Sequence, residues 1–210
     1  MIRRIMLVVC GISLFTVVSC AGTGERIPLQ VQPMIETPGT LSKPTSALRV
    51  AVNIFEDGRT TKGGLGTRTH LWGGVSYFDV PGGNSGEVVA QALTSYLKSK
   101  GWQADVVKPG ATSSGTDVML SGTLQDLAVD AKSGVGSTKI TTTSKIGIQA
   151  RNVADGSLVR MTLRGSGSDR VFWFDPEDAQ EILNEVLTQT FDKLIQDTMV
   201  ENKLLRLKSP

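Results

Sequence analysis

Apolar and polar side chains alternate in residues 48–54, where Leu48, Val50, Val52 and Ile54 share one parity. A period of two is typical of a half-buried β-strand. Residues 84–100 follow a period near 3.6, which predicts an amphipathic helix that begins at an Asn84 cap and ends before Gly101. Residues 102–107 predict a second strand, so the first elements form a β-α-β unit.

Three further segments alternate in the same way, namely residues 118–131, 139–151 and 159–164. The parity of the first segment changes near Gln125 and Asp126, which predicts a β-bulge. The inner row of the second segment is polar at first, so we expect burial to begin at Ile146. A turn is predicted between the last two strands, at the Asp-Gly pair of residues 155–156.

The last regular segment predicts a helix with a strong N-terminal signal. Asp175 is a typical N-cap, and Pro176 occupies the first helical position. The apolar stripe has helical spacing and consists of Ala179, Ile182, Leu183, Val186, Leu187, Thr190, Phe191, Leu194 and Ile195. A stripe this apolar needs a sheet to cover it.

The order β-α-β-β-β-β-α predicts an α+β fold with two layers. Strands with one polar and one apolar face favour a mainly antiparallel sheet, covered on one face by the two helices. We expect a right-handed crossover in the first β-α-β unit. A single domain is predicted over residues 47–205, followed by a tail at 206–210.

The N-terminus has a different character, with two arginines, then an apolar run over residues 5–18, then Cys20. At about 1.5 Å per residue this run is roughly 21 Å long as a helix, short of the roughly 30 Å hydrocarbon core of a bilayer. The layout resembles a bacterial lipoprotein signal peptide over residues 1–19, which implies lipidation of Cys20. A short transmembrane anchor and a leader that is cleaved without lipidation are the alternatives.

Removing this leader changes the charge of the chain. The full sequence has 22 basic and 20 acidic residues; without Arg3 and Arg4 the numbers are equal. No basic footprint for nucleic acid remains. Cys10 leaves with the leader, so a lipidated Cys20 leaves no thiol for a disulfide or a metal.

Residues 20–46 are rich in proline and predict an extended tether behind the lipidated cysteine. Fully extended at about 3.1 Å per residue, such a tether would reach roughly 80 Å, and as a flexible coil it would average roughly 30 Å. Either way it would hold the domain away from the bilayer.

From residue 86 to 203, the chain resembles the YajG-type lipoproteins of Gram-negative bacteria. The resemblance rests on an ordered set of segments: LKSKGW (97–102), DVMLSGTL (117–124), KITTTSKI (139–146), NEVL (184–187) and DT (197–198), with Asn152 and Gly156 between the third and the fourth. It implies an outer-membrane lipoprotein that faces the periplasm. It implies no catalytic residue, because the family is uncharacterised. The glycine-rich segment 57–83 departs from the family pattern.

That segment is predicted to be a loop, and three interpretations of it stay open. Its glycines with Lys62 and Arg68 could cradle a phosphate, although the spacing is not that of a P-loop. It could also be a plain mobile loop. Exposed aromatic residues would instead suit a protein interface, and the candidate partner-binding residues are Arg68, His70, Trp72, Tyr77 and Phe78.

Other candidate chemistry is weaker. His70 is the single histidine of the chain, so a zinc site with several histidine ligands is excluded. A catalytic triad with a serine nucleophile would have to include His70. Carboxylates at 169, 175, 177 and 178 could act together, but helix capping explains the last three. The aromatic segment 172–174 is either core or a docking patch, with Phe172 and Phe174 expected on one side and the core reading favoured.

The sequence thus favours a lipid-anchored, periplasm-facing protein of the outer membrane, with no enzymatic activity, no cofactor and no nucleic-acid partner. We expect it to act as an interaction or accessory module for another envelope protein. A carrier or sensor that binds a lipid or glycan fragment is the alternative, and a hydrolase using His70 is the third hypothesis.

Overall fold

The computed structural model describes residues 24–34, 48–108 and 115–208. The leader, Cys20 and most of the predicted tether lie outside these residues. In chain order the elements are β1 (Arg26–Pro28), β2 (Arg49–Asn53), β3 (Glu56–Asp57), β4 (Gly66–Thr69), β5 (Val75–Asp79), α1 (Ser85–Ser99), β6 (Gln103–Val107), β7 (Val118–Gly134), β8 (Ser137–Asn152), β9 (Leu158–Val171), α2 (Pro176–Asp197), β10 (Thr198–Glu201) and β11 (Leu204–Leu207). No helix among these residues is long and apolar enough to cross a membrane.

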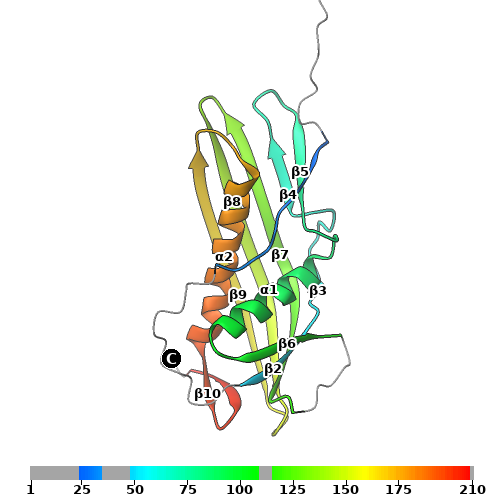
Figure 1. The fold of residues 1–210 in the computed structure, drawn as a ribbon, viewed down its shortest axis with the longest axis vertical. Coiled ribbons are helices and arrows are strands. Elements are labelled where there is room, and N and C mark those ends of the chain that lie inside the picture. The colour runs from blue at the N-terminus through cyan, green and yellow to red at the C-terminus, as the bar shows by residue number, and fades with distance from the viewer. Residues whose placement is uncertain (1–23, 35–47, 109–114, 209–210) are drawn as a thin grey trace, which may run out of the picture.

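The fold is α+β, as predicted, but the sheet is mixed (Figure 1). The long strands β7, β8 and β9 form an antiparallel half. On the other side of β7, strands β2, β3 and β4 pair with it in parallel, and β6 lies parallel to β2. The prediction of a mainly antiparallel sheet was therefore wrong for this half. A strand-helix-strand connection returns the chain in the same direction, which makes β2 and β6 parallel neighbours.

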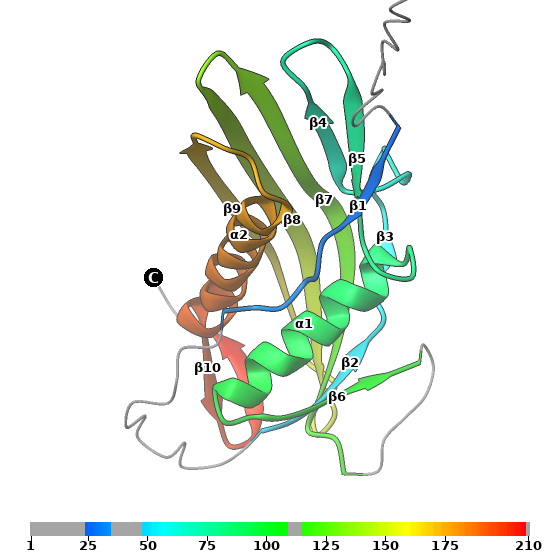
Figure 2. The same ribbon diagram turned by 45° about the horizontal axis from the view of Figure 1, so that its top comes forward.

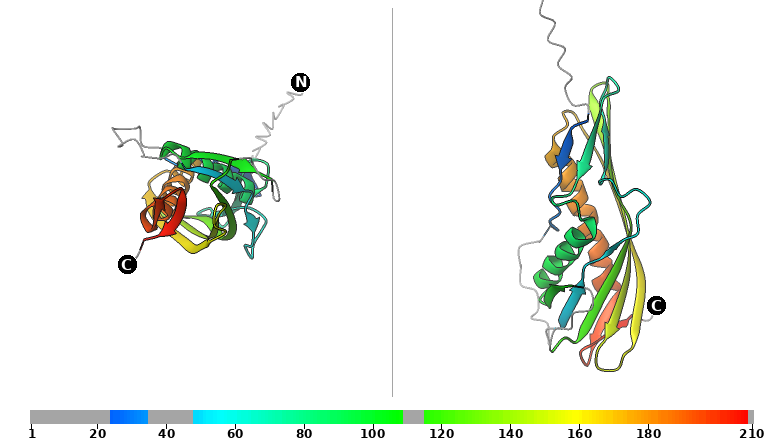
Figure 3. Two further views of the ribbon diagram at one scale, coloured as in Figure 1. Left: turned by 90° about the horizontal axis from the view of Figure 1, so that it is seen from below. Right: turned by 90° about the vertical axis from the view of Figure 1, so that its right-hand side faces the viewer.

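Both helices pack against the same face of the sheet, which the right-hand view of Figure 3 shows edge-on. Side chains of α2 bury against β8 and β9, and those of α1 bury against β2 and β6. Both predicted caps are confirmed. The Asn84 side chain accepts a hydrogen bond from the Glu87 amide at 3.1 Å. Asp175 and Asp178 form a reciprocal capping box at the start of α2.

The predicted bulge is confirmed, because the β7–β8 register shifts between Leu124 and Asp126. The expectation that burial in β8 begins at Ile146 was wrong. Thr142 and Ser144 are only 1% and 3% exposed. The Ser144 hydroxyl lies 2.6 Å from the Thr190 hydroxyl of α2, so the helix covers polar positions that a sequence pattern assigns to solvent.

The segment predicted as a tether is partly built into the domain. Strand β1 pairs in parallel with β5, which places Arg26 opposite Tyr77. The chain then crosses α2, where the Gln32 amide donates to the Asn184 side chain at 2.8 Å and the Met34 amide donates to Thr188 at 2.9 Å. Residues 24–34 are therefore not a free spacer. Their backbone groups find partners on elements far away in the sequence, which composition cannot reveal.

The C-terminal residues also differ from the prediction. Strands β10 and β11 form a hairpin around Asn202 and Lys203, which both have positive φ angles. Asn152 holds this hairpin, because its side chain accepts from the Leu205 amide at 2.8 Å and donates to the Leu205 carbonyl at 3.0 Å. The expected tail at 206–210 therefore begins within a strand.

Candidate functional site

Three connections meet at one end of the molecule. They are the β4–β5 turn, the β7–β8 turn and the β9–α2 connection. Because β4 runs parallel to β7, with Arg68 opposite Ala131, both strands finish at the same end. Strand β9 is antiparallel to β8 and so finishes there as well. Figure 2 shows the two hairpin tips and the start of α2 at this end.

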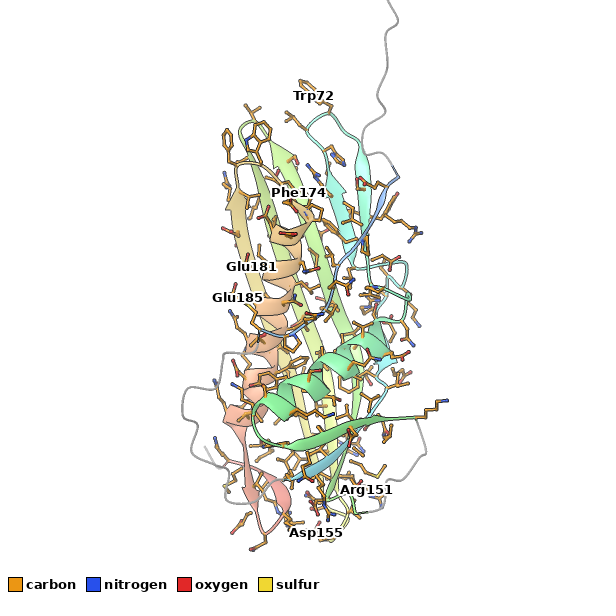
Figure 4. The ribbon with its side chains drawn as sticks, in the orientation of Figure 1. Trp72, Arg151, Asp155, Phe174, Glu181 and Glu185 are labelled. Carbon is orange, nitrogen blue, oxygen red and sulfur yellow. The ribbon has the colours of Figure 1, made fainter. Side chains whose placement is uncertain are left out.

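This end carries exposed apolar side chains from all three connections. Trp72 and Val135 are each 93% exposed, Trp173 is 82% exposed and Phe172 is 70% exposed. Leu71 adds a fifth apolar side chain that is 44% exposed. We call these five residues the apolar end; Figure 4 shows Trp72 at its tip. Large apolar side chains gathered on one surface mark an interaction site more often than scattered ones do.

Beneath the apolar end, a second layer of aromatic side chains closes the core. Phe78 is fully buried, and its ring centroid lies 6.1 Å from that of Phe174. The Arg68 guanidinium lies over the Phe174 ring, 4.0 Å from its centroid. Burial lowers the pKa of Arg68 below its usual range. Phe78 and Arg68 therefore hold the β4–β5 hairpin to the start of α2.

Of the five candidate partner-binding residues, the structure thus removes Phe78, because a buried ring cannot contact a partner. Trp72 is 93% exposed and Tyr77 is 43% exposed. The favoured core assignment for the aromatic segment 172–174 was wrong for Phe172 and Trp173. Strand β9 ends at Val171, so the alternation expected beyond it does not apply. Phe172 instead contacts Trp173 edge to face, with ring centroids 5.3 Å apart.

The predicted glycine-rich loop contains a hairpin, and its glycines have a structural reason. Gly64 and Gly66 have positive φ angles and flank Leu65, which is buried. The Leu65 amide donates to the Phe78 carbonyl at 2.7 Å, and its carbonyl accepts from Val129 at 2.8 Å. A Cβ on Gly66 would lie 2.1 Å from the Val129 carbonyl oxygen. These glycines let Leu65 insert between two strands, so the phosphate interpretation loses its basis.

Arg59 organises this segment, and the sequence interpretation missed it. The guanidinium is 5% exposed and forms a bidentate pair with Asp57, at 2.9 and 2.8 Å. It also donates to the carbonyls of Gly64 and Leu127 and to the Ser85 hydroxyl, at 2.9, 3.1 and 2.8 Å. The hydrogen bonds with Arg59 hold the pKa of Asp57 below its usual value. One buried cation thus joins β3, the loop, β7 and the start of α1.

His70 lies at the top of the β4–β5 hairpin. Its Nε2 atom is 2.7 Å from the Ser76 hydroxyl, and the Ser76 side chain is fully buried. The backbone of His70 closes the turn, because its amide donates to the Gly74 carbonyl at 2.7 Å. A histidine that joins the two strands of a hairpin has a sufficient structural role, and a buried hydroxyl is poorly placed to attack a substrate.

Two of the carboxylates near the apolar end cap helix α2. Asp175 accepts from the Glu177 amide at 3.0 Å, and Asp178 accepts from the Asp175 amide at 2.8 Å. Asp169 accepts from the Arg170 amide at 2.7 Å. Among the described residues, no group of three or more histidine, cysteine or acidic side chains is placed to hold a metal ion.

A depression of about 730 Å³ lies beside the loop that Arg59 organises. Its walls are residues 59–61 and 63–67, Tyr77 and residues of β7 and β8, among them Gln125, Leu127 and Lys145. It opens beside the loop rather than between the helices and the sheet. It is large enough for a small ligand.

The sequence comparison identifies the family. The profile of a family described as uncharacterized lipoproteins, the YajG family, matches residues 81–205. The chain belongs to this family. The match covers α1, the long strands and α2, and confirms the resemblance inferred from the sequence. No curated protein matches the chain.

Solved structures resemble the chain at low sequence identity. Protein XCC0632 from Xanthomonas campestris, of family DUF330, is 12% identical, with a TM-score of 0.50 over 83% of this chain and 93% of that one. An uncharacterized protein is 10% identical, with a TM-score of 0.47 over 83% and 97%. A Helicobacter pylori structure described as a neuraminyllactose-binding hemagglutinin homolog is also 10% identical, with a TM-score of 0.37 over 79% and 89%. The likeness to XCC0632 concerns the fold alone.

Proposed function

We propose that this YajG-family lipoprotein is held in the outer membrane by a lipid on Cys20, faces the periplasm, and acts as a non-catalytic interaction or accessory module in envelope assembly or transport. Family membership supports the lipid anchor. The observation that carries the interaction role is the apolar end, where Trp72, Val135, Phe172 and Trp173 are all at least 70% exposed. Exposing such side chains to water is unfavourable unless another component covers them.

The anchor has a direct test. Replacing Cys20 with alanine should leave an uncleaved or mislocalised precursor, because lipid transfer and cleavage both require that thiol. Fractionation of membranes and labelling with radioactive palmitate measure the result. The matched control is Cys10→Ala, which removes the other cysteine of the chain and should leave processing unchanged. Processing and membrane attachment that survive Cys20→Ala would contradict the assignment.

The interaction role is tested by placing a photoreactive amino acid at Trp72 in cells. We expect adducts with another envelope component at this position. The control position is Val153, an apolar residue 51% exposed beyond the end of β8, where few or no adducts should form. Equal labelling at both positions, or none at Trp72 in repeated experiments, would contradict an interaction surface at the apolar end.

A second candidate function is a carrier or sensor that binds a lipid or glycan fragment. The depression beside the loop favours it, since its volume is about 730 Å³ and its wall combines apolar and polar groups. The same crosslinking experiment separates the two functions when the photoreactive residue is placed at Thr61, which lies in that wall. A lipid or glycan adduct at Thr61 would favour the carrier, whereas adducts restricted to Trp72 favour the interaction module.

A further inference from the structure

The chain enters the domain at the apolar end. The Gly24 amide donates to the Val75 carbonyl at 2.7 Å, and Val75 follows the turn that carries Trp72. From there β1 runs parallel to β5, away from the apolar end (Figure 2). The first described residue therefore lies at the base of the turn that carries Trp72, and the chain continues toward the middle of the molecule.

Cys20 precedes Gly24 by only four residues. Four residues span at most about 14 Å, because an extended chain advances by at most about 3.6 Å per residue. The headgroup region on each side of a bilayer is roughly 5–8 Å thick. If Cys20 carries the lipid, as proposed above, the apolar end cannot move far from the membrane surface. The predicted standoff of roughly 30–80 Å is wrong, because residues 24–34 are paired to the domain.

A row of basic side chains lies just behind the apolar end. Lys132 of β7 is directly opposite Lys139 of β8, which is directly opposite Arg170 of β9. All three are exposed, and within the described part of the chain none of them forms an ion pair. Like charges directly opposite each other on a sheet are destabilising, so folding does not account for this row.

The spacing between this row and the apolar side chains matches a membrane interface. Arg170 precedes Phe172 by two residues, and Lys132 precedes Val135 by three. At about 3.3 Å per residue, the cations lie roughly 7–10 Å behind the apolar tips. Interfacial proteins bury apolar side chains about 5–10 Å deep and keep basic groups at the level of the lipid phosphates.

We propose that the apolar end inserts into the headgroup boundary of the membrane that holds the lipid anchor. This inference rests on the proposed function and names the occupant of its interaction surface. Trp72, Phe172 and Trp173 enter the interface, which aromatic side chains favour, and the basic row contacts lipid phosphates. The carboxylates that cap α2 lie at the same end, so the apolar side chains supply most of the affinity.

Insertion would also set the orientation of the domain. Figure 4 shows Asp155 at the end of the molecule farthest from Trp72. With Trp72 in the membrane, the β8–β9 turn and the β10–β11 hairpin project away from it.

The three tryptophans of the chain provide the test. Single-tryptophan variants keep Trp72, Trp102 or Trp173 and carry phenylalanine at the other two positions. Each full-length lipidated protein is reconstituted into vesicles of phosphatidylethanolamine and phosphatidylglycerol with brominated acyl chains. We expect loss of emission and a blue shift for Trp72 and Trp173. Trp102, which packs against the core before β6, serves as the internal control and should not be quenched.

A matched pair of charge variants tests the basic row. Lys132→Glu with Lys139→Glu should reduce the quenching of Trp72 in vesicles that contain phosphatidylglycerol. Arg151→Glu with Arg160→Glu makes the same change of charge at exposed positions toward the other end of the sheet and should have no effect. Equal effects of the two pairs would mean that the row does not contact lipid.

Flotation of the vesicles separates the possible failures. If the protein floats with the vesicles but Trp72 and Trp173 are quenched no more than Trp102, the insertion is wrong and the anchored module stands. If the protein does not float, both the anchor and the insertion are wrong. A protein adduct at Trp72 in cells, without quenching in vesicles, would assign the apolar end to a protein partner instead.

Discussion

Replacing Arg59 with alanine should lower the free energy of unfolding by about 3 kcal/mol. The guanidinium is 5% exposed and joins Asp57, Ser85 and the carbonyls of Gly64 and Leu127. Removing one partner of a buried ion pair typically costs about 3–5 kcal/mol, and the lower figure applies because Asp57 is partly exposed. Urea denaturation followed by circular dichroism measures the change.

The control for this variant is Arg26→Ala. Arg26 also forms an ion pair, with Asp79 at 2.9 Å, but its side chain is 66% exposed. Exposed pairs contribute about 0–1 kcal/mol, so this variant should be close to the native protein in stability. Equal losses for the two variants would contradict the role assigned to Arg59.

Stability near pH 4 provides a second measurement for the same network. The pKa of Asp57 is lowered in the folded protein, chiefly by its hydrogen bonds with Arg59. Its contribution to stability is therefore present above its ordinary pKa of 3.8 and is lost as the pH falls through the lower folded value. Arg59→Ala should remove this part of the acid sensitivity. If the free energy of unfolding of Arg59→Ala varied with pH as steeply as that of the native protein, the Arg59–Asp57 pair would not contribute to stability.

Gly165→Ala should destabilise the protein by about 3 kcal/mol. A Cβ at this position would lie 2.2 Å from the Thr190 hydroxyl, 2.8 Å from the Val186 carbonyl and 3.0 Å from the Ser144 hydroxyl. Helix α2 would have to move off β9, and the Ser144–Thr190 hydrogen bond would break. Overpacking typically costs about 1–3 kcal/mol, and a lost buried hydrogen bond about 1 kcal/mol more.

Gly134→Ala is the control for this substitution. Gly134 is also a strand glycine, at the end of β7, but the nearest atom to its Cβ position is the Ser137 carbonyl at 3.6 Å. The change should therefore be close to neutral. Thermal unfolding of the two variants measures the difference. A stable Gly165→Ala protein would show that α2 does not rest directly on β9.

Part of the candidate site could be predicted from the sequence. The sequence predicts that Trp72 and Tyr77 are exposed aromatic residues of a glycine-rich segment, and both are exposed. A core position for Phe172 and Trp173 follows from the sequence only if strand alternation continues past the end of β9, which it does not. Nothing in the sequence points to Val135, since one valine in a short turn has no distinctive pattern.

Arg59 could not be found from its neighbours in the sequence. An arginine two residues after an aspartate in a polar segment is usually solvated. Its burial depends on Ser85 and Leu127, which the fold brings to it from α1 and β7. The same reason explains why β1 looked like a tether, because its hydrogen-bond partners lie on β5 and α2.

The sequence by itself determined the features that depend on near neighbours. The two capped helices, the bulge near Asp126 and the long alternating strands follow from spacing and local hydrogen bonding. Only the tertiary structure decided which strands run parallel, where the N-terminal segment docks and that the apolar end exists. These features join groups that are distant in the chain, and pairing between distant groups depends on the whole fold rather than on any local pattern.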